Sequence, residues 1–333
     1  MREPWFWRDR SLADTVVSTA LSPLGAAYNA VQRAQWAATK PASSPIPAIC
    51  IGGATLGGVG KTPFAMLAGE LLRRQDVDAH FVTRGYRGAL HGPERIDLER
   101  HSAIAVGDEP LLLAQVGPCW MAKSRLDGVI AAARSGAEAV ILDDGFQNAS
   151  LKKSLSILLI DNIDPVGNGR VFPAGPCREP LAQAIRRADA VALVKDTLSD
   201  APHPLPDRLL DADKARFTVS LTLEPRALPA TAVAFCGIGA PDRFRRKLQQ
   251  NGVEVRRFIP FSNHHVFSTD DLDLLTVAAR EEKAPLITTE KDFVRLPPEA
   301  RNVILCATAT MIVDAPQKLA SLMMDAVNDG HPV

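Results

Sequence analysis

The sequence lacks an excess of charge of either sign. Its 333 residues contain 38 lysines and arginines against 38 aspartates and glutamates, so the formal net charge at pH 7 is zero. Proteins that bind nucleic acid usually carry a basic surface, because much of their affinity comes from contacts with phosphates. We therefore expect no nucleic-acid partner.

Cysteines are few and scattered along the chain. None of the five forms a C-x-x-C pair or has metal-ligand spacing; they are Cys50, Cys119, Cys177, Cys236 and Cys306. Scattered cysteines without a pairing motif are typical of proteins in a reducing compartment, and we expect these thiols to be reduced in the cytosol.

Long apolar runs are absent from the N-terminal segment. It has no continuous apolar region of the kind found in signal peptides, so we expect no signal peptide. Asp14, Pro23 and Arg33 interrupt it well short of the ~18 apolar residues that a membrane span needs. We therefore expect no transmembrane helix.

This segment does contain an aromatic cluster, Trp5-Phe6-Trp7, close to Arg8 and Arg10 and followed by a mostly apolar helical stretch. Tryptophan beside arginine is typical of a membrane interface, where the ring lies among headgroups and the cation meets anionic lipid. A helix packed on the protein's own core is an equally good interpretation of the same residues.

Beyond a linker at Pro41–Pro47, short apolar runs alternate with amphipathic stretches. Strands are expected at Ala48–Gly52, His80–Thr83, Ala139–Leu142, Ser156–Ile160 and Ala190–Val194, with helices at Phe64–Arg74 and Arg125–Ser135. This alternation predicts a parallel sheet covered by helices on both faces.

A second α/β series follows a break in the pattern near Pro202–Pro206. Its strands are expected at Ala232–Cys236, Val253–Phe258, Pro285–Thr288 and Val303–Cys306, and its helices at Asp242–Gln250, Thr269–Arg280 and Pro316–Val327. We predict an N-terminal segment over 1–40, a core lobe over 41–215 and a second, smaller lobe over 216–333, with a cleft between the lobes.

Between the first strand and the first helix of the core lobe lies G-G-A-T-L-G-G-V-G-K-T-P. Glycines let backbone amides turn toward a phosphate, and the helix start adds partial positive charge. We expect Lys61 to reach the β- and γ-phosphates of a nucleotide and Thr62 to bind Mg²⁺. The full nucleotide-binding set is Thr55, Leu56, Gly57, Gly58, Val59, Gly60, Lys61 and Thr62.

The loop departs from the P-loop pattern G-x-x-x-x-G-K-S/T, because Thr55 stands where the first glycine belongs. It resembles the K-G-G-x-G-K-T loop of dimeric partitioning ATPases, in which the leading lysine reaches the partner's nucleotide. Leu56 occupies that position, so such a contact cannot form.

Asp143 and Asp144 follow an apolar strand, at the end where a parallel sheet places ligand-binding groups. We expect them to bind Mg²⁺ and Gln147 to face the cleft; which aspartate contacts the metal stays open. The chain lacks the N/T-K-x-D motif with which GTPases bind guanine, so ATP is the expected nucleotide.

Two further pairs carry groups suited to acid–base chemistry. Asp108 and Glu109 stand together before a proline, as a metal ligand and a base often do, although a solvated turn is the alternative. His264 and His265 lie between aromatic residues, where histidines are catalytic or structural.

Two more segments could line the same cleft. Arg178 and Glu179 lie in a loop bounded by glycine and proline, where an arginine could bind a phosphate through two hydrogen bonds. Arg84 and Tyr86 follow the strand after the first helix, again at a carboxyl end. Ordinary loop structure is the alternative for both.

Taken in order, the motifs resemble those of the tetraacyldisaccharide 4′-kinases, the lipid A kinases of Gram-negative bacteria. They are T-L-G-G-V-G-K-T-P, T-R-G-Y, V-G-D-E-P, L-D-D-G-F-Q, P-A-G-P-x-R-E-P, F-x-G-I-G-x-P-x-R-F, N-H-H and T-E-K-D. The match extends from Pro4 to about Asp292.

This resemblance implies transfer of the γ-phosphoryl of ATP to the 4′-hydroxyl of a tetraacyldisaccharide 1-phosphate, with Mg²⁺ as cofactor. It implies Asp108 as the base that accepts the hydroxyl proton, tuned by a histidine, with His264 favoured over His265. Glu109, Asp143 and Asp144 would serve the metal. Arg84, Tyr86, Gln147, Arg178 and Glu179 would contact substrate or phosphate.

The resemblance also implies a fold and a location. The fold would be α/β, with a P-loop NTPase-type parallel sheet in the core lobe, a smaller α/β lobe and an N-terminal membrane-associating helix. Moving four acyl chains out of a bilayer costs much free energy, so the enzyme would have to reach its substrate at the membrane. Trp5, Phe6 and Trp7 would anchor it peripherally on the cytoplasmic face of the inner membrane. The lipid substrate would be its partner, and we expect no obligate protein partner.

Two other functions stay open on the residues alone. A nucleotide-switched membrane ATPase would release phosphate to water, and Leu56 argues against its dimeric form. A membrane scaffold with an inactive loop would bind no nucleotide, and the intact Lys61, Thr62 and paired aspartates argue against it.

Overall fold

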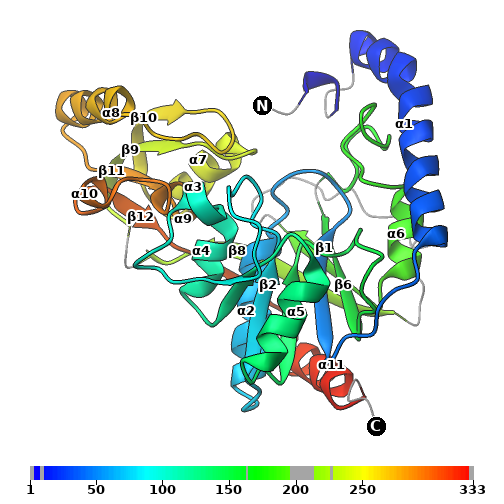
Figure 1. The fold of residues 1–333 in the computed structure, drawn as a ribbon. Helices are drawn as coiled ribbons and strands as arrows, with labels where there is room; N and C mark the ends of the chain where they lie inside the picture. The colour runs from blue at the N-terminus through cyan, green and yellow to red at the C-terminus, as the bar shows by residue number, and fades with distance from the viewer. Residues whose placement is uncertain (1–3, 8–10, 163, 196–213, 226–227, 330–333) are drawn as a thin grey trace.

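The computed structural model describes residues 4–7, 11–162, 164–195, 214–225 and 228–329 of the chain (Figure 1). Arg8, Arg10 and the predicted break at Pro202–Pro206 lie outside these ranges. Within the described residues the strands form one sheet of nine and one sheet of four.

The central strands of the large sheet are apolar along almost their whole length. Every residue of β1 (Ala48–Gly53), β2 (Ala79–Thr83) and β5 (Ala139–Asp143) is buried. The sheet order is β13-β8-β7-β6-β1-β5-β2-β4-β3, parallel except for the two edge strands β13 and β3. The remaining strands are β3 (Glu94–Arg95), β4 (Cys119–Met121), β6 (Leu155–Asp161), β7 (Ala190–Lys195), β8 (Ala215–Leu223) and β13 (Ala309–Val313).

Helices cover both faces of this sheet, as continuous apolar strands require. Ile49 and Ile51 pack in one core cluster with residues of α2, α4 and α11, whereas Cys50 packs in another with residues of α5 and α6. The alternation follows from the two-residue period of a strand. The helices are α2 (Lys61–Arg73), α3 (Ala103–Val106), α4 (Asp108–Ala114), α5 (Arg125–Arg134), α6 (Leu181–Arg187) and α11 (Pro316–Asp329).

The small sheet is parallel throughout, in the order β10-β9-β11-β12. Residues of α7 pack on one side of it and residues of α8 on the other, in two separate apolar clusters. Its elements are β9 (Thr231–Cys236), α7 (Pro241–Gln250), β10 (Glu254–Pro260), α8 (Thr269–Glu282), β11 (Leu286–Thr289), α9 (Glu290–Phe293), α10 (Pro298–Arg301) and β12 (Leu305–Ala307).

After the small sheet the chain returns to the large one. β13 pairs antiparallel with β8, and Leu319 and Met323 of α11 pack in the same cluster as Phe64 of α2. The sequence-based limits assign residues 216–333 to the second lobe. In the structure most of β8 and all of β13 belong to the large sheet, and α11 packs on it. The local sequence pattern does not show which sheet a strand joins, because long-range pairing determines it.

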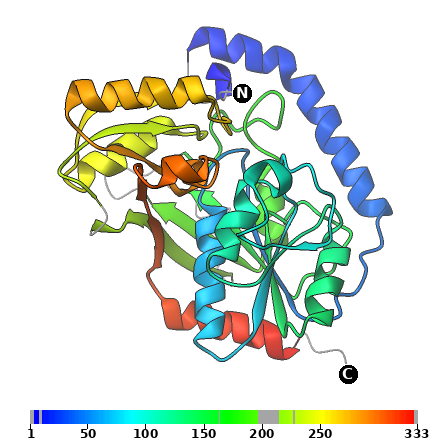
Figure 2. The same cartoon turned by 60° about the vertical axis from the view of Figure 1, so that its left-hand side comes forward.

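The N-terminal helix, α1 (Leu12–Ala38), lies along one side of the molecule in both ribbon views (Figure 2). Its start is closed by a capping box, in which the Ser11 hydroxyl accepts from the Asp14 amide and the Asp14 carboxylate accepts from the Ser11 amide. No helix among the described residues has the length and apolar character needed to cross a bilayer.

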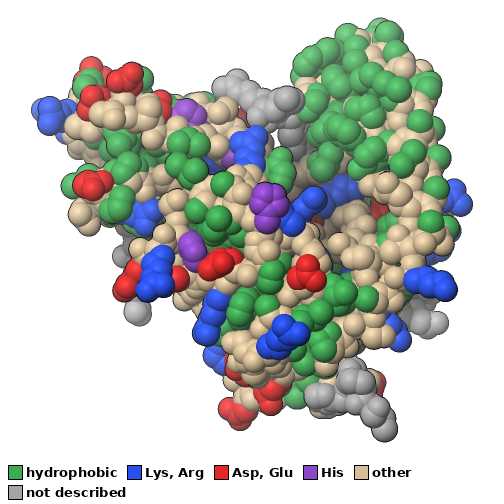
Figure 3. Space-filling view, viewed as in Figure 1, with side chains coloured by type: hydrophobic (Ala, Val, Ile, Leu, Met, Phe, Trp, Pro, Cys, Tyr) green, Lys and Arg blue, Asp and Glu red, His purple; other side chains and the backbone are tan. Residues whose placement is uncertain are grey.

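The burial of α1 is inverted relative to an ordinary surface helix. Apolar side chains at helical spacing point outward: Leu12 is 88% exposed, Val16 68%, Leu24 58% and Val31 57%. The opposite stripe is polar or small and faces the protein; its buried residues are Asp14, Ser18 and Gly25. Figure 3 shows hydrophobic side chains gathered over this part of the surface.

The three N-terminal aromatics have different surroundings in the 3₁₀ turn η1 (Trp5–Trp7). Trp5 is exposed and Phe6 is half-buried, but Trp7 is 6% exposed. The Trp7 indole donates to Pro173 O at 3.0 Å, and its ring packs edge-on against Phe172. Trp7 therefore differs from the sequence-based expectation of a lipid contact: it fastens this turn to the protein.

Candidate active site at the carboxyl edge of the large sheet

β1 ends in the glycine-rich loop, which leads directly into α2. Gly57 and Gly60 have φ values of 137° and 91°, which other residues rarely adopt. The Leu56 amide donates to Pro176 O at 2.7 Å, which holds the loop against the 170–178 segment. Since the first amides of a helix have no acceptor within it, the loop and the start of α2 can offer donors to an anion.

Thr62 and Asp143 meet directly behind this loop. The buried Thr62 hydroxyl donates to Asp143 Oδ2 at 2.9 Å, whereas Asp143 Oδ1 is buried and accepts no hydrogen bond from the described residues. Burial, with the charges of Glu109 and Asp144, raises the pKa of Asp143 to about 7. A buried carboxylate with an orphaned oxygen and acidic neighbours is a place where a cation would be stabilising.

Asp144 is engaged by two cations. Its carboxylate accepts two hydrogen bonds from Arg178, at 2.7 and 2.8 Å, and Lys61 Nζ lies 3.8 Å from Oδ1. Burial opposes ionisation, but Lys61 and Arg178 hold the pKa of Asp144 well below its usual range. The pKa of Lys61 is itself lowered, chiefly by burial. Asp143 is therefore the aspartate with an oxygen left to bind.

Gln147, Arg178 and Glu179 form one hydrogen-bonded group beside Asp144. The Gln147 amide accepts from Arg178 at 3.0 Å and donates to Glu179 at 3.2 Å and to Gly53 O at 3.3 Å. Glu179 is buried and accepts two hydrogen bonds from Arg187, at 2.7 and 2.8 Å. All three predicted residues thus lie at the end of β1, and Glu179 is occupied by an arginine.

Asp108 is brought together with His264, although 156 residues separate them. His264 Nδ1 lies 3.1 Å from Asp108 Oδ2, and Arg295 contacts the same oxygen. Arg295 is held in turn by Asp292 at 3.0 Å and by Gly237 O at 3.1 Å. Burial works against ionisation, but the hydrogen bond to His264 and the charges of Lys291 and Arg295 hold the pKa of Asp108 well below its usual range.

Glu109 follows Asp108 at the start of α4 and pairs with Lys291 across the gap between the sheets, at 3.2 Å. Burial works against the charge of Lys291, but Glu109 and Asp108 raise its pKa. The charges of Glu109, Asp108 and Asp143 all favour the protonated form of Lys291, which contacts Glu109 directly. These three predicted carboxylates therefore act on one lysine.

The two histidines have different partners. His265 Nε2 lies 2.9 Å from Asp271 Oδ2, and its ring stacks on Phe261, so it belongs to the packing of α8. The ring of Tyr86 packs edge-on against His264, with centres 5.5 Å apart. Arg84 is exposed at the end of β2. The structure thus brings His264, and not His265, next to Asp108.

Among the described residues, no three His, Cys, Asp or Glu side chains are arranged as a complete metal site. Magnesium rarely needs one, since it usually binds one or two carboxylates and takes its other ligands from phosphates and water. The orphaned Asp143 Oδ1 and the adjacent Thr62 hydroxyl fit that mode.

A parallel sheet with a donor-rich loop and buried aspartates at its edge, faced by an Asp–His pair, defines an enzyme of the phosphotransferase class. The sequence model of the LpxK family, described as Tetraacyldisaccharide-1-P 4′-kinase, matches residues 17–328. The chain belongs to this family.

Relatives match along nearly their whole length. The tetraacyldisaccharide 4′-kinase of Paramagnetospirillum magneticum is 41% identical over 327 residues, which cover 97% of this chain and 98% of the relative. That of Rhodospirillum centenum is 39% identical over 333 residues, with 97% and 96% covered. The resemblance inferred from the motifs is confirmed.

A solved structure is similar as well. It is LpxK from Aquifex aeolicus in complex with ATP, which superposes with a TM-score of 0.75 at 26% identity and covers 93% of this chain and 99% of that one. The predicted α/β fold with a parallel-sheet core is confirmed.

Four charged residues of the site were not predicted: Arg125, Arg187, Lys291 and Arg295. Arg125 is buried and donates to the carbonyls of Asp143 and Asp144, at 3.3 and 3.2 Å. Lys291 stands in the T-E-K-D motif directly after a strand, and that position could have marked it. Arg295 carries no comparable local signal, because it reaches Asp108 across 187 residues.

Proposed function

We propose that this chain transfers the γ-phosphoryl of ATP to the 4′-hydroxyl of a tetraacyldisaccharide 1-phosphate, the step of lipid A biosynthesis that forms lipid IVA. The observation that carries this assignment is the position of the Asp108–His264 pair. Asp108 precedes Glu109, which contacts Lys291, and the charges of Glu109, Asp108 and the loop-site residue Asp143 all act on that lysine. A hydroxyl held by the pair would therefore stand next to a phosphate held by the loop.

In this proposal the loop is a P-loop. The amides of residues 55–62 and the start of α2 bind the phosphates of ATP, and Lys61 turns from Asp144 to the β- and γ-phosphates. Magnesium, held by Thr62 and Asp143 with Asp144 and Glu109 near it, would neutralise charge that builds up on the transferred group. Support comes from the orphaned oxygen of Asp143.

Asp108 accepts the proton of the acceptor hydroxyl, and His264 tunes and orients it. The low pKa of Asp108 makes it a weak base. A strong base is not needed, because in a loose transition state the hydroxyl loses its proton late. Most of the rate enhancement then comes from positioning the hydroxyl. Arg295 supplies that positioning by holding the carboxylate from the opposite lobe.

The remaining predicted residues contact the reacting groups. Arg178 binds phosphate as it binds Asp144, through two parallel hydrogen bonds. Gln147 and Glu179 fix Arg178 in place. Tyr86, exposed beside His264, and Arg84, exposed at the end of β2, line the entry of the disaccharide as the smaller lobe closes the cleft.

The acceptor's acyl chains bring the enzyme to the membrane. We propose that the outward apolar stripe of α1, with Trp5 and the half-buried Phe6, lies in the headgroup region of the inner membrane, on the cytoplasmic side where ATP is available. Exposed apolar residues on a helix that buries its polar face support this. The lipid substrate is the partner, and no protein partner is required.

The test is to incubate the purified protein with γ-labelled ATP and the disaccharide 1-phosphate in detergent micelles. We expect the label in the lipid, and we expect Lys61→Ala to prevent it. Label that appears only as inorganic phosphate would instead indicate an ATPase, and no nucleotide binding would indicate a scaffold.

A further inference from the structure

Arg125, the first residue of α5, is a buried arginine whose guanidinium binds backbone carbonyls; it is 5% exposed. Its Nη2 donates to Asp143 O at 3.3 Å and to Asp144 O at 3.2 Å, and its Nη1 donates to Ala122 O at 3.5 Å. Its Nε is buried and has no acceptor among the described residues. Arginine is rarely buried unless it is paired with an acid, so its contact with the two aspartate carbonyls requires an explanation.

These two carbonyls belong to the turn that follows β5. The pairing of β5 ends at Leu142 toward β2 and at Asp143 toward β1, so the Asp144 carbonyl lies beyond the sheet and needs a donor from elsewhere. Asp144 has a φ of 55°, in the left-handed region that residues other than glycine enter only at a cost in free energy. Because one nitrogen of Arg125 binds both carbonyls, it holds the two peptide groups in this relative orientation.

The left-handed turn directs the two neighbouring carboxylates to different partners. Asp143 Oδ2 accepts from the Thr62 hydroxyl at 2.9 Å, and Asp143 Oδ1 accepts from no described residue. Asp144 accepts two hydrogen bonds from Arg178. A different φ at Asp144 would move its side chain relative to that of Asp143. The conformation of the turn therefore decides whether both contacts form at the same time.

Arg125 is also a fixed cation. Burial lowers the pKa of Arg125, and the charges of Asp144 and Asp143 act in the opposite direction. The charge of Arg125 is in turn one of those that hold the pKa of Asp144 low. The start of α5 is held in place, since a Cβ at Gly128 would lie 2.7 Å from Val82 Cγ1 of β2. The guanidinium therefore has little freedom to follow the turn if the turn moves.

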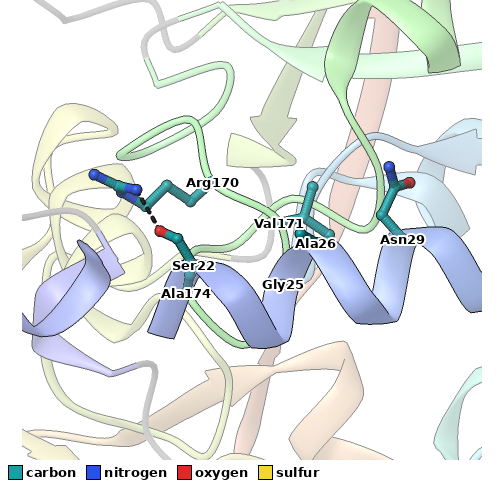
Figure 4. Close-up of a pocket in the computed structure, with 7 residues that line it drawn as sticks. All are labelled: Ser22, Gly25, Ala26, Asn29, Arg170, Val171 and Ala174. Atoms are coloured by element: carbon teal, nitrogen blue, oxygen red, sulfur yellow. Dashed lines mark hydrogen bonds between the residues drawn. The ribbon is translucent and has the colours of Figure 1, made fainter. Parts of the chain in front are cut away.

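Other arginines of the chain bind in other ways. Arg170 lies in a hollow of about 210 Å³ between α1 and the loop that carries it, and it donates to the Ser22 hydroxyl (Figure 4). Arg256 donates to a carbonyl, Glu282 O, at 2.7 Å, but on the surface of the small sheet. It lies near the start of β10, whereas the groups that meet Asp108 follow the ends of the parallel strands. Arg256 is therefore a suitable control for Arg125.

We propose that Arg125 is a positioning residue for the metal, because it holds the turn of Asp143 and Asp144 in the left-handed conformation. In that conformation Asp143 keeps an oxygen for the cation while Asp144 is bound by Arg178. The assignment rests on the proposed function, since it takes the cation at Asp143 to be the Mg²⁺ of the nucleotide. Arg125 acts through the peptide groups of the two aspartates and not through their carboxylates.

The test measures by calorimetry the affinity for a non-hydrolysable ATP analogue, once with Mg²⁺ and once with EDTA, and without acceptor. We expect wild type to bind more tightly with Mg²⁺. Arg125→Met should lower the affinity with Mg²⁺ by about 10- to 100-fold, as loss of a residue that orients metal ligands does, and leave the affinity in EDTA unchanged. Arg125→Lys should lose less, since an ammonium still binds a carbonyl but lacks the fork. Arg256→Met, the matched control, should bind like wild type in both conditions.

A second arm tests the turn itself with a double-mutant cycle. Glycine adopts a φ near 55° without help, so in an Asp144→Gly background the change Arg125→Met should cost much less of the Mg²⁺-dependent affinity. An equal loss in both backgrounds would overturn the assignment, because Arg125 would then not act through the turn. Where Arg125→Met does not fold, Arg125→Lys is measured in both backgrounds.

Two other results would overturn the assignment. A variant that is less stable in urea but keeps the Mg²⁺ dependence of wild type would show that Arg125 serves stability alone. A loss of the same size with Mg²⁺ and with EDTA would show that it supports the phosphate loop. Failure of the proposed function is a separate result, since a wild type that binds the nucleotide with Mg²⁺ but transfers no label to lipid would contradict that function alone.

Discussion

The guanidinium of Arg187 lies 4.3 Å from the centre of the Trp36 ring, near the C-terminal end of α1. It also lies 4.8 Å from the centre of the Phe146 ring, and its N–H groups donate to Glu179. From Glu179 the contacts continue through Gln147 to Arg178. The helix proposed to lie at the membrane is thereby joined to the proposed phosphate site by an unbroken series of contacts.

Replacing Arg187 tests how strongly this series of contacts depends on the charge of the arginine. Arg187→Ala would leave Glu179, whose side chain is 2% exposed, as an unpaired buried carboxylate. We expect the free energy of unfolding to fall by about 3 kcal/mol, since removing one member of a buried pair strands the other. Urea denaturation measures this. Arg187→Lys should lose clearly less, and equal losses for the two variants would contradict a role of the charge.

The Trp36 ring can be tested separately, through catalysis. Trp36→Phe keeps an aromatic face for Arg187, whereas Trp36→Leu keeps only bulk. If the contact positions Arg178, kcat should fall in the leucine variant and be largely retained in the phenylalanine variant, with both proteins folded. A loss of the same size in both variants would mean that the ring serves packing alone.

The apolar stripe of α1 predicts a defect in membrane binding that leaves the chemistry intact. Leu12→Ser with Val16→Ser removes two outward side chains, and we expect binding to lipid vesicles to weaken by about 10- to 100-fold, in line with the apolar area withdrawn from lipid. ATP binding should not change. Leu274→Ser, an equally apolar exposed position on α8, is the control and should bind vesicles like wild type.

Asp108 predicts a loss of rate with unchanged binding of ATP. Asp108→Ala should lower kcat by about 10²- to 10⁴-fold, the usual worth of a positioned base. Because this change also removes one of the two carboxylates that bind Arg295, Asp108→Asn is the better variant for the rate: it keeps the shape and removes the charge. Turnover near that of wild type in the asparagine variant would remove Asp108 from the mechanism.

The pair formed by Thr62 and Asp143 predicts a defect in metal use. Thr62→Val removes the hydroxyl that donates to Asp143 and that would bind Mg²⁺. We expect the Mg²⁺ concentration for half-maximal rate to rise by about 10- to 100-fold. The buried Thr288, which donates to Phe235 O in the small sheet, offers the same substitution as a control for the loss of a buried hydroxyl. An unchanged Mg²⁺ requirement would contradict the assignment.

The local sequence pattern predicts many residues of the candidate site. The glycine loop, Asp143 with Asp144, and Asp108 with Glu109 each follow a short segment whose pattern shows where a strand or helix ends, and parallel strands bring such ends to one edge. Arg295 could not be found in this way, because it meets Asp108 across 187 residues and only tertiary packing joins them. That Asp108 contacts His264 and not His265 could likewise not be found from their own segment, because the two histidines are neighbours and differ in their tertiary partners.

The N-terminal segment shows what amino-acid composition alone does not predict. Its apolar content predicts either a membrane face or a core face, but the sequence does not tell which stripe of α1 packs on the protein. The structure shows the polar stripe inside, with Ser22 bound by Arg170, and Trp7 buried. The strands β8 and β13 were missed because their pairing is fixed by partners far along the chain.

The most direct test of the central claim is the position of the new phosphate on the product. After reaction with ATP and the disaccharide 1-phosphate, ³¹P NMR of the purified lipid should show a second phosphomonoester coupled to the proton at the 4′ carbon, and Lys61→Ala should form none. A phosphate on another hydroxyl, or one found only in solution, would contradict transfer from the Lys61 loop to a hydroxyl held by Asp108.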